Sequence, residues 1–131
     1  MSRSASEVLR EAPKDESDKL ARLRTIRAHA DQAHDLMTEG DISGLGSLIG
    51  EAWDAKRGIS ASITGDELDG LHQRIMDMGA TGAKLLGAGG GGFFLVHGSS
   101  GLREQLVSFG EPHRLIPLDV DWTGSKIIHN G

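Results

Sequence analysis

The stretch from Gly79 to His97 decides the fold and reads GATGAKLLGAGGGGFFLVH. Two short apolar runs within it, Lys84–Leu86 and Phe93–His97, have the length and composition of strands. The residues between them, Gly87–Gly92, are all glycine except Ala88. Glycine allows a backbone to turn tightly, to adopt positive φ and to approach another surface closely. The stretch therefore predicts two consecutive strands joined by a loop, called here the glycine loop (Gly87–Gly92).

Upstream of this stretch, apolar residues recur at the spacing of amphipathic helices. Asp41 is the predicted N-cap of the second helix, and Thr64 and Glu67 form a predicted capping box at the start of the third. Gly79 suits the left-handed residue that follows a helix. Three helices are thus predicted, over residues 18–39, 42–57 and 64–78.

Downstream of the glycine loop, Ser99 or Ser100 is the predicted cap of a short helix that ends at Gly110. Two more strands are predicted, over His113–Val120 and Ser125–His129. Short connections between consecutive strands favour antiparallel pairing. We therefore expect an α+β fold, with a four-stranded antiparallel sheet and helices packed on one face.

The composition excludes several classes of function. The chain of 131 residues is long enough for one domain, and its net charge of −5 leaves no basic stripe for nucleic acid. It has no cysteine and its six histidines lack metal-ligand spacing, so we expect neither a disulfide nor a metal site. No apolar run has the ~20 residues that cross a bilayer. The expected protein is cytoplasmic and binds neither membrane nor nucleic acid.

The glycine loop has two readings on physical grounds alone. Consecutive N–H groups in such a loop can converge on an anion such as a phosphate, but a glycine run can also be a plain hairpin connection. No Gly-Lys-Ser/Thr follows, as a Walker loop requires, and a strand follows where a Rossmann fingerprint requires a helix. A second glycine-rich segment, Ser43–Ser47, lies within a helical pattern and is predicted to be helix interior.

Residues Gly79–Phe93 resemble the third conserved motif of the GHMP kinases, a superfamily that includes galactokinase, homoserine kinase and mevalonate kinase. The flanking sequence resembles bacterial D-glycero-D-manno-heptose 7-phosphate kinases and fucokinase-like sugar kinases. Ala83 departs from the glycine usual in heptose kinases, which leaves the substrate open. The flanking segments that carry the resemblance are Ser2–Leu9, Glu51–Arg57, Asp66–Asp69 and Gly124–Ile128.

The resemblance implies a GHMP kinase C-terminal domain over residues 1–131, with a ferredoxin-like fold. Family members carry a Pro-x-x-x-Gly-Leu-Gly-Ser-Ser-Ala phosphate loop and the catalytic acid in an N-terminal half, and neither occurs here. We therefore expect a fragment that is inactive alone and binds no cofactor, whereas the full-length enzyme uses ATP and Mg²⁺. The catalytic residues are expected in the missing half.

The resemblance also assigns roles to residues. It places the glycine loop (Gly87, Ala88, Gly89, Gly90, Gly91 and Gly92) beside ATP and the acceptor sugar. The candidate ligands for a substrate phosphate are Arg3, Lys56, Arg57 and Lys84. Lys84 could equally be a solvated strand lysine, and Lys56 and Arg57 could instead complement the helix dipole. Trp53 is predicted to be core and not a platform for a sugar ring.

The full-length protein is thus expected to be an ATP-dependent sugar or sugar-phosphate kinase. Its expected partners are the sugar substrate and the N-terminal half of the same kinase. The sequence leaves open whether the protein forms a homo-oligomer. The rival function is a non-catalytic module for small-molecule binding or assembly that reuses this fold.

Overall fold

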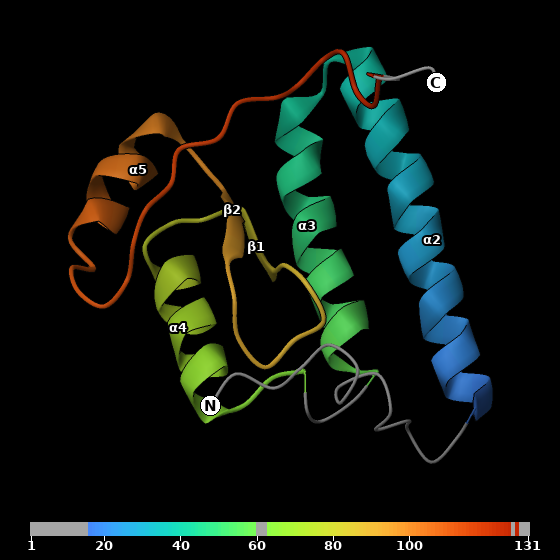
Figure 1. Cartoon of the computed structure of the whole chain (residues 1–131), viewed down its shortest axis with the longest axis horizontal. Helices are drawn as coiled ribbons and strands as arrows, with labels where there is room; N and C mark the ends of the chain where they lie inside the picture. Colours follow the sequence, from blue (N-terminus) through green and yellow to red (C-terminus); the bar gives the residue numbers. More distant parts are fainter. Residues whose placement is uncertain (1–15, 60–62, 127, 129–131) are drawn as a thin grey trace.

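The computed structural model describes residues 16–59, 63–126 and 128. Four helices and one two-stranded sheet are defined in these parts of the chain, which confirms the α+β class. Their order is α2 (Glu16–Glu39), α3 (Ile42–Arg57), α4 (Asp66–Asp77), β1 (Gly82–Leu85), β2 (Phe94–His97) and α5 (Ser100–Val107). In Figure 1, α2 and α3 lie side by side, and the two strands run between α3 and α4.

The predicted N-cap is correct for α3 but not for α4. The N–H of Gly44 donates to Asp41 Oδ1 at 3.0 Å, so the predicted N-cap of α3 is confirmed. The capping box predicted for α4 is wrong by one residue, because Gly65 occupies the N-cap position. The Thr64 hydroxyl lies one residue too early to bond the helix amides and donates to Asp69 Oδ1 instead.

The two strands pair antiparallel, with Leu85 opposite Phe94 and Gly82 opposite His97. Backbone bonds continue the ladder beyond both ends of the strands. The N–H of Leu86 donates to the carbonyl of Phe93 at 2.8 Å, and that of Thr81 donates to the carbonyl of His97 at 2.9 Å. The hairpin predicted around the glycine loop is therefore confirmed, and the Leu86–Phe93 bond closes the base of that loop.

Helix α3 packs on β1 at a point where both elements carry glycine. A Cβ on Gly82 would overlap the carbonyl oxygen of Gly46 on α3. A Cβ on Gly46 would in turn meet the side chains of Thr81 and His97. Absence of both side chains lets the helix and strand backbones come into direct contact, and this sets the position of α3 over the hairpin.

The core forms beside this contact, where Leu85 and Phe94 share one face of the hairpin. Trp53 of α3 and Leu85 are fully buried and cluster with Ile63. The ring of Phe94 meets Trp53 edge-on at 5.9 Å between centroids, a preferred aromatic geometry. His72 of α4 packs 5.7 Å from Trp53. Residues of α3 and α4 thus meet in one aromatic cluster beside Phe94 of β2.

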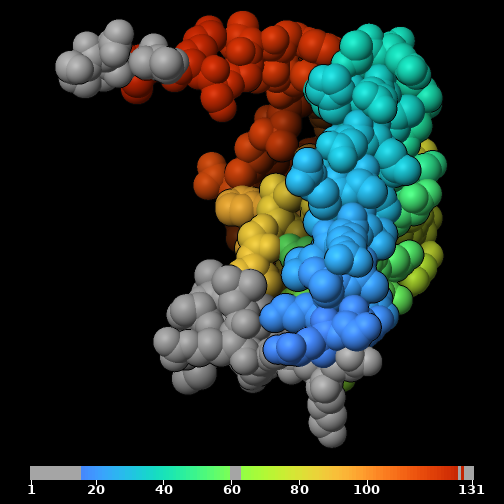
Figure 2. Space-filling model, turned by 90° about the vertical axis from the view of Figure 1, so that its right-hand side faces the viewer, coloured from blue at the N-terminus to red at the C-terminus, as the bar shows by residue number. Residues whose placement is uncertain are grey.

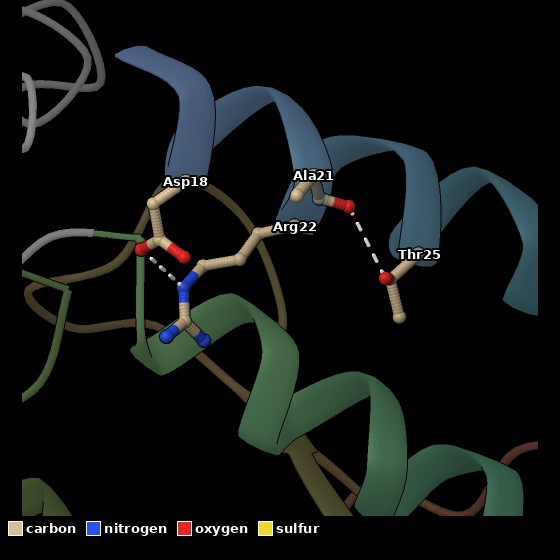
Figure 3. A network of polar contacts seen from close by, with 4 residues as sticks. All are labelled: Asp18, Ala21, Arg22 and Thr25. Atoms are coloured by element: carbon tan, nitrogen blue, oxygen red, sulfur yellow. Dashed lines mark hydrogen bonds and ion pairs between the residues drawn. The ribbon is translucent and has the colours of Figure 1, made fainter. Parts of the chain in front are cut away.

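Helix α2 packs against α3 on the side away from the strands (Figure 1). Arg22 on α2 is held by Asp18 one turn earlier, with 3.0 Å between Nε and Oδ2 (Figure 3). Its guanidinium lies against Gly58 at the end of α3, where a Cβ would overlap it. Positive charge is favourable at a helix C-terminus, so Arg22 links the two helices there.

The prediction of four strands is wrong for the described residues, because His113–Val120 forms no strand. The segment has the length and apolar content of a strand, but no neighbouring strand in the described parts of the chain supplies backbone hydrogen bonds to it. Its apolar side chains are exposed, Leu118 to 63%. Figure 2 shows this part of the chain, in red, stretching along one end of the molecule. The other predicted strand, Ser125–His129, lies partly outside the described residues.

A separate finding concerns membranes. Within residues 16–59 and 63–126, none of the helices is both long enough and apolar enough to cross a bilayer.

The contact between Gly46 and Gly82 generates a first prediction. Gly82→Ala should destabilise the chain by about 1–3 kcal/mol, because the added methyl group forces α3 away from β1. Urea unfolding followed by circular dichroism measures this free energy. The matched control is Gly50→Ala on α3, where a Cβ meets nothing within 4 Å. That variant should be more stable than the parent by about 0.5–1 kcal/mol, from helix propensity. Equal stability of the two variants would contradict the packing argument.

Candidate functional site

The glycine loop joins β1 to β2 with a backbone that only glycine adopts readily. Its φ angles are positive at five positions, between +74° and +147°, and no non-glycine residue in the described chain has positive φ. A β-branched or bulky side chain is strongly disfavoured in this region of φ. The glycines are therefore required by the conformation. The five are Gly87, Gly89, Gly90, Gly91 and Gly92.

The middle of the loop is held by the segment before α4. The N–H of Gly90 donates to the carbonyl of Ile63 at 3.1 Å. A Cβ on Gly89 would lie 2.7 Å from Ile63 Cα, so the two backbones are in close contact. Gly91 and Gly92 lie on the exposed side, and their N–H groups have no partner among the described residues. One side of the loop is thus fixed, and the exposed side carries N–H groups without a partner among the described residues.

The start of the loop is held by Lys56 from the last turn of α3. Its Nζ donates to the carbonyl of Leu85 at 2.9 Å and also to the carbonyl of Gly87. Leu85 ends β1 and Gly87 begins the loop, so a single ammonium group spans the junction. The glycine loop and Lys56, two parts of the predicted site, are therefore brought together by the fold.

Positive charge gathers at this junction. Half-burial lowers the pKa of Lys56 below the ordinary lysine value of 10.5, and the nearby positive charge of Lys84 lowers that pKa further. In the described parts of the chain, neither lysine forms an ion pair with a carboxylate. Two ammonium groups at the start of the glycine loop give this junction a positive potential, which favours an anion.

The remaining sequence candidates lie elsewhere or outside the described chain. Arg57 is exposed and pairs with Asp54 on its own helix, with 3.4 Å between Nε and Oδ1. Arg3 lies outside the described residues. Trp53 is fully buried, which confirms the prediction that it belongs to the core. Ser43–Ser47 lies inside α3, which confirms helix interior for that segment.

Two residues that hold the loop and its strand escaped sequence reasoning. Ile63 acts through its backbone carbonyl, and no sequence pattern marks which carbonyl a distant amide will reach. His72 donates from Nε2 to the carbonyl of Ala83 on β1 at 3.2 Å, which ties α4 to the strand that leads into the loop. The helical spacing of His72 from Leu68 could have placed it on the buried side of α4.

Metal ligands do not gather anywhere in the described residues: no group of three or more His, Cys, Asp or Glu side chains there could hold a metal ion.

Comparisons with known proteins identify the family of the chain. Residues 33–108 match the family model described as GHMP kinases C terminal. The chain is 31% identical over 74 residues to a D-glycero-alpha-D-manno-heptose 7-phosphate kinase from Campylobacter jejuni, covering 56% of this chain and 22% of that protein. It is 34% identical over 88 residues to a galactokinase from Pyrococcus furiosus, covering 60% of this chain and 24% of that protein.

The chain thus spans about a quarter of the length of these curated relatives, both of which are sugar kinases. The family match includes α3, α4, the hairpin and the glycine loop, and it extends over more than half of the chain. The resemblance seen in residues Gly79–Phe93 is confirmed at the level of the family. On this basis the chain belongs to the GHMP kinases, of which it carries the C-terminal domain.

Proposed function

We propose that this chain is the C-terminal part of an ATP-dependent sugar or sugar-phosphate kinase. In this proposal the glycine loop closes the active site beside the nucleotide and the acceptor sugar. The observation that carries it is the loop itself, with five glycines at positive φ and two lysines at its start. The curated relatives, a heptose 7-phosphate kinase and a galactokinase, supply the reaction class.

The geometry suits the demands of phosphoryl transfer. The protein's contribution to that reaction is mainly positioning and stabilisation of negative charge on the moving phosphoryl group. The exposed N–H groups of Gly91 and Gly92 can donate to phosphate oxygens or to sugar hydroxyl groups. A loop fixed at Ile63 and Lys56 keeps these donors in place before the substrates bind.

Lys84 is the strongest candidate ligand for a phosphate on the substrate. It lies on the strand that enters the loop, is only partly buried, and has no carboxylate partner among the described residues. Lys56 uses two of its three donors on carbonyl groups, so it has little capacity left for a ligand. Arg3 and Arg57 stay predictions for this role.

ATP and Mg²⁺ fit the proposal only together with a second half of the enzyme. The glycine loop offers donors and positive charge for phosphates, but the described residues hold no cluster of carboxylates for the metal. We propose that the nucleotide loop, the metal ligands and the catalytic acid come from an N-terminal half of the same kinase. The main partner of this chain is then that half, and the enzyme is cytoplasmic.

A second prediction concerns the chain alone. Purified chain incubated with ATP, Mg²⁺ and a panel of hexoses and heptose phosphates should release no ADP above the enzyme-free control. Joined to the nucleotide-binding half, it should turn over at a rate typical of kinases, on the order of 1–100 per second. A coupled ADP assay measures both. Normal turnover by the chain alone would contradict the two-part proposal, and absence of turnover in the joined protein would favour a non-catalytic module.

A third prediction tests the loop within the joined enzyme. Gly87 has a φ of +83°, and a Cβ there meets nothing within 4 Å. Gly87→Ala should therefore strain the loop backbone without a clash and move its donors. Misplaced positioning groups cost on the order of a hundredfold in rate, so kcat/KM should fall by roughly tenfold to a hundredfold.

The chain supplies a matched control for this strain. Gly40, between α2 and α3, has a φ of +79° and equally open space around its Cβ position. Gly40→Ala should lower the thermal midpoint about as much as Gly87→Ala but leave kcat/KM unchanged. Equal kcat/KM values for the two variants would show that the glycine loop is not part of the active site.

A further inference from the structure

Lys56 occupies an unusual place for a lysine in the last turn of a helix. Such a side chain commonly lies near the free carbonyl groups of its own helix. Here Nζ instead donates to Leu85 and Gly87, 29 and 31 residues further along the chain. Helix-dipole stabilisation therefore does not account for where the ammonium group lies. Its partners are two backbone carbonyls on either side of the strand-to-loop junction.

The two acceptor carbonyls, of Leu85 and Gly87, lie where the backbone changes direction. Between Leu85 and Gly87 the chain leaves the sheet, and φ changes to +83° at Gly87. Leu86 itself is fixed by its N–H bond to the carbonyl of Phe93. An ammonium group that bonds the carbonyls before and after Leu86 fixes the orientation of both peptide planes. The loop cannot rotate about this junction without breaking a charge-assisted hydrogen bond.

The anchor of this ammonium group is rigid. The residues of α3 around Lys56 include the fully buried Trp53 and the buried Ala55. Near the start of α3, the Gly46–Gly82 contact fixes the same helix against β1. Half-burial beside Lys84 makes the charged form of Lys56 costly, so the position is not favoured by charge alone. The two hydrogen bonds to the carbonyl groups of Leu85 and Gly87 offset the cost of burying this lysine.

We infer that Lys56 is a positioning residue that fixes the orientation of the glycine loop. This inference rests on the proposed function for its kinetic consequence but not for its structural one. Lys56 acts through the carbonyls of Leu85 and Gly87 and does not bind the substrate. Loss of its ammonium group should loosen the loop and lower kcat, with KM values little changed.

The structural test uses the chain alone and hydrogen exchange by NMR. Lys56→Met keeps the unbranched stem and removes the three donors. The protected amides of Leu86 and Gly90 should exchange about tenfold faster or more. The amide of Thr81, at the far end of the hairpin, should be unchanged. Arg57→Met, the adjacent residue with an exposed ion pair, is the matched control and should alter none of the three. Unchanged exchange at Leu86 and Gly90 in Lys56→Met would overturn the inference.

A measurement on the unsubstituted chain covers the case in which Lys56→Met does not fold. Nζ of Lys56 should show scalar coupling across its hydrogen bonds to the carbonyl carbons of Leu85 and Gly87. Coupling to neither carbon at low temperature, where the ammonium protons exchange slowly, would contradict the geometry.

The kinetic test uses the joined enzyme. In Lys56→Met, kcat should fall by about tenfold to a hundredfold, while KM for ATP and for the sugar changes less than about threefold. A raised KM with normal kcat would instead make Lys56 a substrate ligand and overturn the inference. If the unsubstituted joined enzyme shows no turnover, the proposed function fails, and the exchange experiment still decides the role of Lys56.

Discussion

The contact between the backbones of Gly46 and Gly82 is the constraint on which the rest of the structure depends. It places α3 directly against β1, with no side chain between them. With α3 at that distance, Trp53 reaches Leu85 and Phe94 and forms the core. Three residues beyond Trp53, the same helix brings Lys56 to the start of the glycine loop. Packing and site geometry thus follow from a single close approach of helix and strand.

The glycine loop combines two physical properties that a phosphate-handling element needs. Gly91 and Gly92 are exposed and their N–H groups have no partner among the described residues, and the anchors of the loop at Lys56 and Ile63 restrict how far it can move. Preorganised donors stabilise developing charge better than mobile ones, because less reorganisation is needed when the charge forms. Membership of the GHMP kinases supplies the context in which such a loop would act.

The sequence predicted those features whose signals are local. Helical periodicity, the Asp41 cap and the pair of apolar runs around the glycine loop specify α2 to α5 and the hairpin. Two predictions failed because they depend on neighbours or on register. His113–Val120 has a strand pattern but no paired strand in the described chain, and Thr64 lies one residue before the cap position. The role inferred for Lys56 could not be predicted, since its partners are carbonyl groups that carry no residue identity.

The central claim is that the glycine loop lies beside the nucleotide in the assembled kinase. Its most direct test is paramagnetic broadening by Mn²⁺, bound with a non-hydrolysable ATP analogue to the joined enzyme with ¹⁵N-labelled glycine. Gly40 is the internal reference, since it lies just before the first residue of α3, whereas the loop is bonded to Lys56 in the last turn of that helix. We expect the signals of the five loop glycines to lose intensity while that of Gly40 persists. Equal intensities at the loop and at Gly40 would contradict the claim.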